Sequence, residues 1–278
     1  MDSFSVIIEL LLIVMVILCG VSSAGLSAYI CRVEDGTYCN VCSNRKTCFA
    51  HKKLGKDSNW ISEFMLITYW KMRRNCKEII NIPLWRYFVI ILYDILAMLL
   101  LFWSKGSGLD TIIYCIVSVM LIALSVVDWN TQYIPVEYTC IIFLCGLIHL
   151  FADFSNWLQY LIGLIAVSGF LCIVNWIATP IIRRKYEGVN EIDSVIGDGD
   201  VKLMAATGLL LGWKLNFVAL GIGCVIGSII QIVLVKVKGS DRQFALGPYL
   251  SLGVYITMIC GEQLVSWYLN MIGISPMQ

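Results

Sequence analysis

The chain has 278 residues, of which 59% are apolar and 14% are charged, and its formal net charge at pH 7 is +1. Soluble domains carry roughly 45–50% apolar and about 25% charged residues, whereas the mean hydropathy of this chain is +0.82. A soluble globular protein is therefore excluded, and no nucleic-acid partner is expected. The apolar residues gather into runs of near-membrane length, which predicts an all-α, polytopic helix bundle in a lipid bilayer.

The first apolar run, Phe4 to Cys19, has the length of a signal peptide but lacks its usual flanks. Asp2 and Glu9 stand where basic residues would be expected, and no small-residue cleavage site follows. We therefore expect this run to be retained as a membrane span. With it, the sequence predicts about eight transmembrane segments, at about 4–30, 86–103, 111–127, 137–152, 158–178, 203–213, 215–235 and 246–272.

These segments divide the chain into three parts. Residues 1–30 form the first span, residues 31–85 form a basic, cysteine-bearing loop, and residues 86–278 form a membrane-embedded helix bundle. The segment 203–213 is short for a full crossing, which indicates a partial or tilted helix.

Basic residues are distributed unequally between the two sides of the membrane. With alternating spans, eighteen of the 20 Lys and Arg residues fall on one side, and only Lys105 and Lys214 fall on the other. Cytoplasmic loops carry an excess of Lys and Arg. The long loop 31–85 is therefore predicted to be cytoplasmic, and Asp128 and Asp200 are predicted to lie at the cytoplasmic face.

The cysteines of the cytoplasmic loop suggest a small metal site. Cys39 and Cys42 have the C-x2-C spacing with which two thiolates can face one tetrahedral zinc ion. Cys48, Cys76 or His51 could complete the ligand set. The alternative is a set of unligated thiols on a basic surface that is attracted to anionic lipid headgroups.

Two acidic residues stand out because a carboxylate within a membrane segment is costly and usually functional. Asp128 ends an apolar run, and Asp200 lies in the segment Gly197-Asp-Gly-Asp-Val-Lys202. Two carboxylates that share a proton can catalyse aspartyl proteolysis. Gly197 and Gly199 are expected to allow a positive φ and a close approach of backbone to substrate. Lys202 could favour an ionised member of the pair or act as a cytoplasmic anchor.

Other polar groups are assigned plainer roles. Asp198 is expected to be a solvated turn residue, and Glu137 to face the membrane interface. Asp94 lies within the second span, where a hydrogen-bonding role and a part in the site are equally open. The two histidines, His51 and His149, occur in no metalloprotease motif, and serine-hydrolase and P-loop motifs are absent from the sequence.

The order of these features resembles that of the type IV prepilin peptidases, membrane aspartyl proteases with a G-x-G-D motif. The resemblance covers nearly the whole chain. Its pieces are the first span with its cysteine-bearing loop, Ile82-Pro-Leu-Trp-Arg-Tyr87, Asp128 followed by Ile134-Pro135, Gly197-x-Gly-Asp-x-Lys202, and Phe244-Ala-Leu-Gly-Pro-Tyr-Leu250.

The resemblance implies that Asp128 and Asp200 are catalytic, with Gly197, Gly199 and Lys202 in support. It further implies a bacterial inner-membrane enzyme that removes the basic leader of type IV prepilins or pseudopilins at the cytoplasmic face without a cofactor. Bifunctional members of the family add N-methylation with S-adenosylmethionine.

The chain departs from the family in two places. Gly20-Val-Ser-Ser-Ala-Gly-Leu-Ser27 replaces the usual Gly-Ser-Phe-x-Asn segment, and only one of two C-x2-C pairs is intact. Both changes bear on methyl transfer and on zinc, for which Cys39, Cys42, Cys48 and Cys76 are the candidate ligands. Two other functions are open: a proton-coupled transporter or channel that uses Asp128 and Asp200, and a protease similar to signal peptide peptidase. The latter class has a P-A-L step, which this chain lacks.

Overall fold

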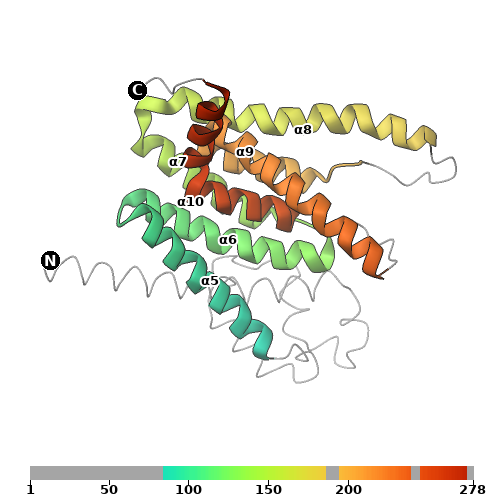
Figure 1. Cartoon of the computed structure of the whole chain (residues 1–278), viewed down its shortest axis with the longest axis horizontal. Coiled ribbons are helices and arrows are strands. Elements are labelled where there is room, and N and C mark those ends of the chain that lie inside the picture. The colour runs from blue at the N-terminus through green and yellow to red at the C-terminus, as the bar shows by residue number, and fades with distance from the viewer. Residues whose placement is uncertain (1–83, 186–193, 239–244, 274–278) are drawn as a thin grey trace, which may run out of the picture. The chain divides into compact units, whose positions relative to one another are not determined.

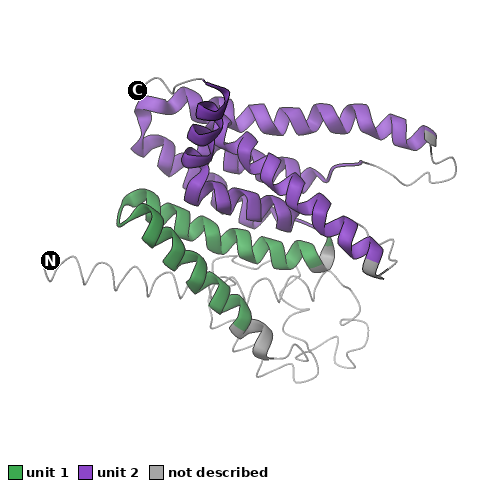
Figure 2. Ribbon diagram, viewed as in Figure 1, with its two compact units in different colours: residues 1–132 green, residues 133–278 purple. Residues whose placement is uncertain are grey.

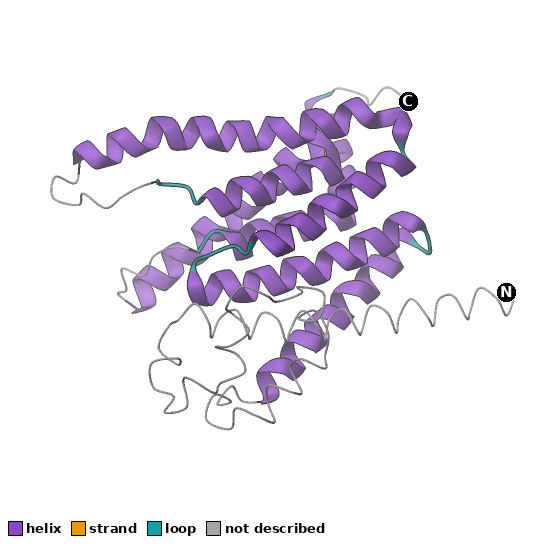
Figure 3. Ribbon diagram, turned by 180° about the vertical axis from the view of Figure 1, so that it is seen from behind, coloured by secondary structure: helices purple, strands orange, loops and turns teal. Residues whose placement is uncertain are grey.

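The computed structural model describes residues 84–185, 194–238 and 245–273. These residues form helices joined by short loops, and no strand occurs among them (Figures 1 and 3). The predicted first span and cysteine-bearing loop lie outside the described residues, and so do the four candidate zinc ligands. The chain divides into two compact units at residues 132 and 133, and each is described by itself (Figure 2).

The described part of unit 1 is a pair of helices, α5 (Leu84–Lys105) and α6 (Leu109–Thr131). Gly106 ends α5 with a φ of 74°, and its N–H bonds to the carbonyl of Phe102 at 3.0 Å. A positive φ at this position is the usual glycine-dependent end of a helix. The short connection turns the chain back, so that α6 packs against α5.

One face of α5 is buried at the spacing of a helix stripe. Asp94, Ala97, Met98 and Leu101 follow the pattern i, i+3, i+4, i+7, and all are at most 7% exposed. α6 is also apolar, and its serines bond within the helix: Ser118 Oγ donates to the carbonyl of Cys115 at 2.8 Å. A membrane helix must satisfy its polar groups internally in this way.

The described part of unit 2 contains four longer helices and one short connecting helix. They are α7 (Val136–Ala152), the 3-10 helix η2 (Phe154–Asn156), α8 (Trp157–Lys185), α9 (Asp198–Lys238) and α10 (Gly247–Ile272). α9 packs against α7, α8 and α10 and is therefore the centre of the unit (Figure 1).

The helix α9 is broken at Gly212, which has the non-helical angles φ 76° and ψ 169°. Asn216 Nδ2, beyond the break, donates to the carbonyl of Met204 at 2.8 Å. Residues this far apart in one straight helix would be separated by about 18 Å along its axis. The chain therefore folds back at Gly212, and α9 consists of two halves, 198–211 and 213–238. The predicted boundary between spans 203–213 and 215–235 falls at this break.

Small residues let the helices of unit 2 approach closely. A Cβ on Gly163 of α8 would collide with the carbonyl oxygen of Gly208, and one on Gly146 of α7 would lie 3.3 Å from Leu209 Cβ. A Cβ on Gly253 of α10 would collide with the carbonyl of Ala219. Close crossings at small residues are typical of membrane helices, because lipid gives no hydrophobic drive to bring helices together.

Three helices among the described residues are long and apolar enough to cross a membrane: Leu109–Trp129, Phe154–Arg184 and Asp198–Lys236. α7 is a shorter apolar helix. The all-helical prediction is confirmed over the described residues, while the number of spans stays a prediction. Most helix bounds agree with the predicted spans, such as 136–152 for the predicted 137–152.

Candidate active site

The segment Gly197–Asp200, here called the GDGD turn, forms the beginning of α9. The carbonyl of Gly197 accepts the N–H groups of Asp200 at 3.1 Å and of Val201 at 3.4 Å, so helical hydrogen bonding starts at this residue. The predicted span begins at 203, because apolarity starts only there. Asp198 and Asp200 instead lie in the first helical turn, where the helix dipole favours acidic side chains.

The positive φ predicted for the two glycines is contradicted by the backbone angles, while their close approach to substrate stays a prediction. Among the described glycines only Gly106, Gly212 and Gly273 have a positive φ, so Gly197 and Gly199 do not use that freedom. Space is limited at both positions instead, and more strongly at Gly199. A Cβ on Gly199 would lie 2.6 Å from the Cβ of Ile134, and one on Gly197 would lie 3.2 Å from Asp200 Oδ2.

The contact between Gly199 and Ile134 brings two of the motifs together within unit 2. Ile134 and Pro135 precede α7, and Pro135 is the N-cap residue of that helix. Pro135 has a φ of −64° and an extended ψ of 133°, as expected for a residue that ends a loop and opens a helix. The Ile-Pro step therefore packs directly against the GDGD turn.

The two candidate carboxylates are both buried. Asp200 is 8% exposed, and its carboxylate folds back toward Gly197. Asp128 is 4% exposed and lies in the last turn of α6, where its carbonyl accepts the N–H of Gln132 at 2.9 Å. Asp128 belongs to unit 1 and Asp200 to unit 2. Each side chain is thus placed within its own unit.

The neighbouring polar residues are placed as follows. Asp198 and Glu137 are exposed, as expected. Lys202 is also exposed, and both of its predicted roles, anchor and support of the pair, stay predictions. Asp94 is 1% exposed, and neither of its carboxylate oxygens has a hydrogen-bond partner among the described residues. Within those residues, no group of His, Cys, Asp and Glu could hold a metal ion.

A buried polar pair holds the first half of α9 against the second. The hydroxyl of Thr207 donates to Asn216 Oδ1 at 3.0 Å, and Asn216 Nδ2 bonds to Met204 as described above. Both side chains are completely buried. Sequence reasoning missed this pair, although polar residues inside an apolar segment are the known signal for contacts between membrane helices.

A second missed residue, Asn175 of α8, binds the segment that leads into the GDGD turn. Its Oδ1 accepts the backbone N–H groups of Val195 at 2.9 Å and of Ile196 at 3.0 Å. The Thr179 hydroxyl donates to the same oxygen at 3.1 Å. An Asn in the middle of an apolar span was again the available signal.

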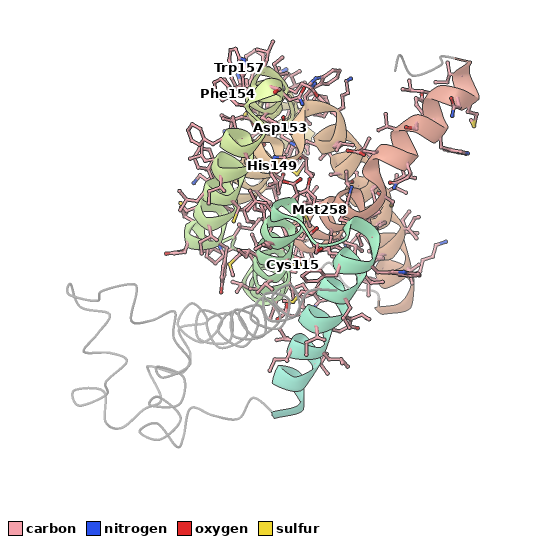
Figure 4. The ribbon with its side chains drawn as sticks, turned by 90° about the vertical axis from the view of Figure 1, so that its left-hand side faces the viewer. Cys115, His149, Asp153, Phe154, Trp157 and Met258 are labelled. Carbon is pink, nitrogen blue, oxygen red and sulfur yellow. The ribbon has the colours of Figure 1, made fainter. Side chains whose placement is uncertain are left out.

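Another carboxylate of unit 2, that of Asp153, lies between α7 and η2, in surroundings that differ from those of Asp200 (Figure 4). Its Oδ2 accepts hydrogen bonds from Asn156 Nδ2 at 2.9 Å and from the Tyr160 hydroxyl at 2.8 Å. These two bonds, with a smaller contribution from His149, hold the pKa of Asp153 below its usual value. His149 packs its ring edge-on to Tyr160, with centroids 5.2 Å apart. The hydrogen bonds of Asn156 and Tyr160 to Asp153 therefore close the turn between α7 and α8.

Comparison with known proteins gives one family. A family profile described as the type IV leader peptidase family matches residues 115–232. This region contains Asp128, the Ile-Pro step and the GDGD turn, together with α8 and most of α9. No solved structure matches the chain.

Three similar curated proteins bear the name prepilin leader peptidase/N-methyltransferase. The protein of Aeromonas salmonicida (strain A449) is 26% identical over 204 residues, which are 72% of this chain and 65% of the relative. That of Legionella pneumophila is 28% identical over 60% of this chain and 56% of the relative. That of Burkholderia pseudomallei (strain 1026b) is 30% identical over 59% and 50%. The chain thus spans less than two thirds of the length of these relatives. The profile match and these relatives show that the chain is similar to the type IV leader peptidase family.

Proposed function

We propose that this protein is a prepilin leader peptidase of the bacterial inner membrane. It would cut type IV prepilins or pseudopilins after the basic leader, with Asp128 and Asp200 as the catalytic pair. The observation that carries the proposal is the contact between Ile134 and Gly199. Only residues 129–133 separate Asp128 from Ile134 in the sequence, and Gly199 is adjacent to Asp200. Within unit 2, the Ile-Pro step that follows Asp128 in the sequence thus packs against the motif that carries Asp200.

The chemistry of such a pair follows from its electrostatics. Two nearby carboxylates cannot both ionise at low cost, so the pair holds one proton and titrates as a unit. The ionised carboxylate removes a proton from water, whose oxygen attacks the scissile carbonyl carbon. The protonated carboxyl donates to the carbonyl oxygen. The C–N bond then breaks as the first carboxyl gives the proton that it took from water to the amide nitrogen. One hydroxyl of the tetrahedral intermediate returns its proton to the second carboxylate, so one ionised and one protonated carboxyl are restored.

The orientation of the site is part of the proposal. In unit 2, the end of α9 that carries the GDGD turn also carries Lys202. The C-terminal part of α8, which carries Arg183 and Arg184 near its end, lies at the same end, because Asn175 of α8 bonds to Val195 and Ile196 just before the turn. Lys214 lies at the other end, next to the break at Gly212. By the positive-inside rule, the end with the GDGD turn faces the cytoplasm. A basic prepilin leader, which stays in the cytoplasm, would meet the site there.

N-Methylation and zinc belong to the proposal only as sequence-based predictions. Cys39, Cys42, Cys48 and Cys76 lie outside the described residues, and no step of the proteolysis proposed here passes through zinc or S-adenosylmethionine. The transporter alternative is less well supported, because the similar proteins are named as leader peptidases.

The proposal is tested by expressing the chain with the pilin subunit of the same organism in a host without its own leader peptidase. We expect the mass of the pilin to fall by that of the leader, and a further gain of one methyl group would report N-methylation. A pilin that keeps its leader, although the protein is present in the membrane, would contradict the proposal and favour the transporter.

A further inference from the structure

Asn175 makes an unusual connection for a residue of an apolar helix. Its side-chain oxygen accepts three hydrogen bonds, two of them from successive backbone N–H groups that are 20 and 21 residues further along the chain. Successive N–H groups that converge on one oxygen form a concave backbone arrangement called a nest. Asn175 thereby fixes the conformation of Val195 and Ile196, and this connection is called the Asn175 tether below.

The Asn175 tether is directly continuous with the candidate active site. Ile196 is followed by Gly197, whose carbonyl accepts the N–H of Asp200. The carboxylate of Asp200 also lies close to Gly197, since a Cβ on this glycine would be 3.2 Å from Asp200 Oδ2. A shift of Ile196 would therefore move the backbone against which Asp200 is oriented.

The rest of α9 does not depend on this tether. The first half of this helix is held at residues 204–208, by the close crossing of Gly163 with Gly208 and by the bonds of Asn216 to Thr207 and Met204. Loss of the Asn175 acceptor should thus leave the packing of α9 in place. The largest change is expected at the GDGD turn itself.

We propose that Asn175 is a positioning residue for Asp200, a role that rests on the proposed peptidase function. It contacts neither the substrate nor the reacting atoms. It holds the segment 194–197 so that the carboxylate of Asp200 has one orientation at the start of α9. Misplacement of a catalytic group by about 1 Å can cost about 100-fold in rate, so the effect belongs in kcat rather than in KM.

The test compares three variants of the full chain in detergent with a prepilin substrate. Asn175→Leu removes the acceptor at similar size, Asn175→Asp keeps an acceptor oxygen, and Thr179→Val removes the third donor but leaves both backbone bonds. We expect Asn175→Leu to lower kcat by about 10- to 100-fold with KM within about twofold. Asn175→Asp should recover most of the activity, and Thr179→Val should resemble the wild type.

Hydrogen exchange measures the tether without reference to activity. The amides of Val195 and Ile196 should be protected in the wild type and in Asn175→Asp, and should exchange faster in Asn175→Leu. Wild-type kcat in Asn175→Leu, or an equal loss in Asn175→Leu and Asn175→Asp with lowered thermal stability, would overturn the positioning role. If the wild type cleaves no prepilin, the proposed function fails and the positioning role fails with it, while the exchange data still decide whether the tether exists.

Discussion

Two acidic turns lie at opposite ends of the first half of α9 and use their carboxylates in different ways. Asp153 is near the end with Gly212, since Tyr160 lies 3.7 Å from the position of a Cβ on that glycine. Asp200 is at the other end. Asp153 is partly exposed, and its partners Asn156 and Tyr160 follow within seven residues. Asp200 is buried, and the residues that shape its surroundings, Ile134 and Asn175, come from other helices or their ends.

The difference separates a structural carboxylate from a candidate catalytic one. A local set of donors, Asn156 and Tyr160, stabilises the charge of Asp153 and closes a turn. Asp200 is buried beside a turn in which Gly199 packs against Ile134, which precedes α7, and in which Asn175 of α8 binds the preceding residues Val195 and Ile196. Functional sites often depart in this way from local rules and are supported by distant segments.

The largest expected effect comes from removing the proposed catalytic carboxylates, Asp128 and Asp200. Asn keeps the shape of Asp but does not exchange the proton, so Asp128→Asn and Asp200→Asn should each lower leader cleavage by roughly 1,000-fold or more. The proposed pair acts as one unit, so the double variant is expected to be no worse than either single one. Asp153→Asn and Asp198→Asn serve as matched controls and should keep most of the activity. Cleavage is measured from the mass of the pilin, and membrane content from immunoblots.

A normal rate in either catalytic variant would refute the aspartyl mechanism. A loss in Asp153→Asn as large as that in Asp200→Asn would remove the distinction between the two turns.

The next largest effect concerns the space at the GDGD turn. Gly199→Ala would place a Cβ 2.6 Å from that of Ile134. Overpacking of this kind costs about 1–3 kcal/mol, and here it also displaces Asp200. We expect reduced cleavage and a lower unfolding temperature. The control is Gly221→Ala in the same helix, where nothing lies within 4 Å. Equal behaviour of the two variants would show that the close approach at Gly199 is unimportant.

The sequence was sufficient for features that depend on apolarity and on motif order. The predicted spans 158–178 and 246–272 correspond to helices 157–185 and 247–272, because a run of apolar residues reports burial in lipid. Apolarity alone underestimates the length of helices that continue past the apolar region. α8 continues through Pro180 to the basic residues at its end, and α9 starts before its apolar residues.

The remaining features could not be predicted, because they depend on contacts between distant residues. The role of Gly199 follows from Ile134, and that of Asn175 from backbone groups 20 residues away. The sequence indicated glycine flexibility at 197 and 199, whereas the structure requires their small size. Asn175 and Asn216 were visible only as polar residues in apolar spans, which predicts a hydrogen bond but not its partner.

A smaller effect is expected at the break in α9. Removal of the Asn216 amide leaves the Thr207 hydroxyl and the Met204 carbonyl without this buried partner. Hydrogen bonds between membrane helices contribute about 0.6 kcal/mol on average, so Asn216→Ala should lower the free energy of unfolding by about 1 kcal/mol. Thr207→Val and the double variant complete a mutant cycle. Unfolding in mixed micelles gives the coupling energy, and a coupling near zero would contradict the assigned pairing.

The smallest expected effect is at Asp153, and it depends on pH. The pKa of Asp153 is below its ordinary value of 3.8 in the folded protein, chiefly because Asn156 and then Tyr160 donate to the carboxylate. The contribution of this carboxylate to stability is therefore present above about pH 3.8 and is lost as the pH falls through the lower, folded value. Tyr160→Phe should lower the unfolding temperature at pH 7 by on the order of 1 °C, and this difference from the wild type should shrink toward pH 3.

Gln159→Ala is the matched control, because Gln159 bonds to Asn156 and not to the carboxylate. Its effect should not change with pH in this range. A Tyr160→Phe difference that is constant from pH 7 to pH 3 would mean that Tyr160 acts through its packing against His149 and Gly212, and the carboxylate of Asp153 would lose its assigned role in closing the turn.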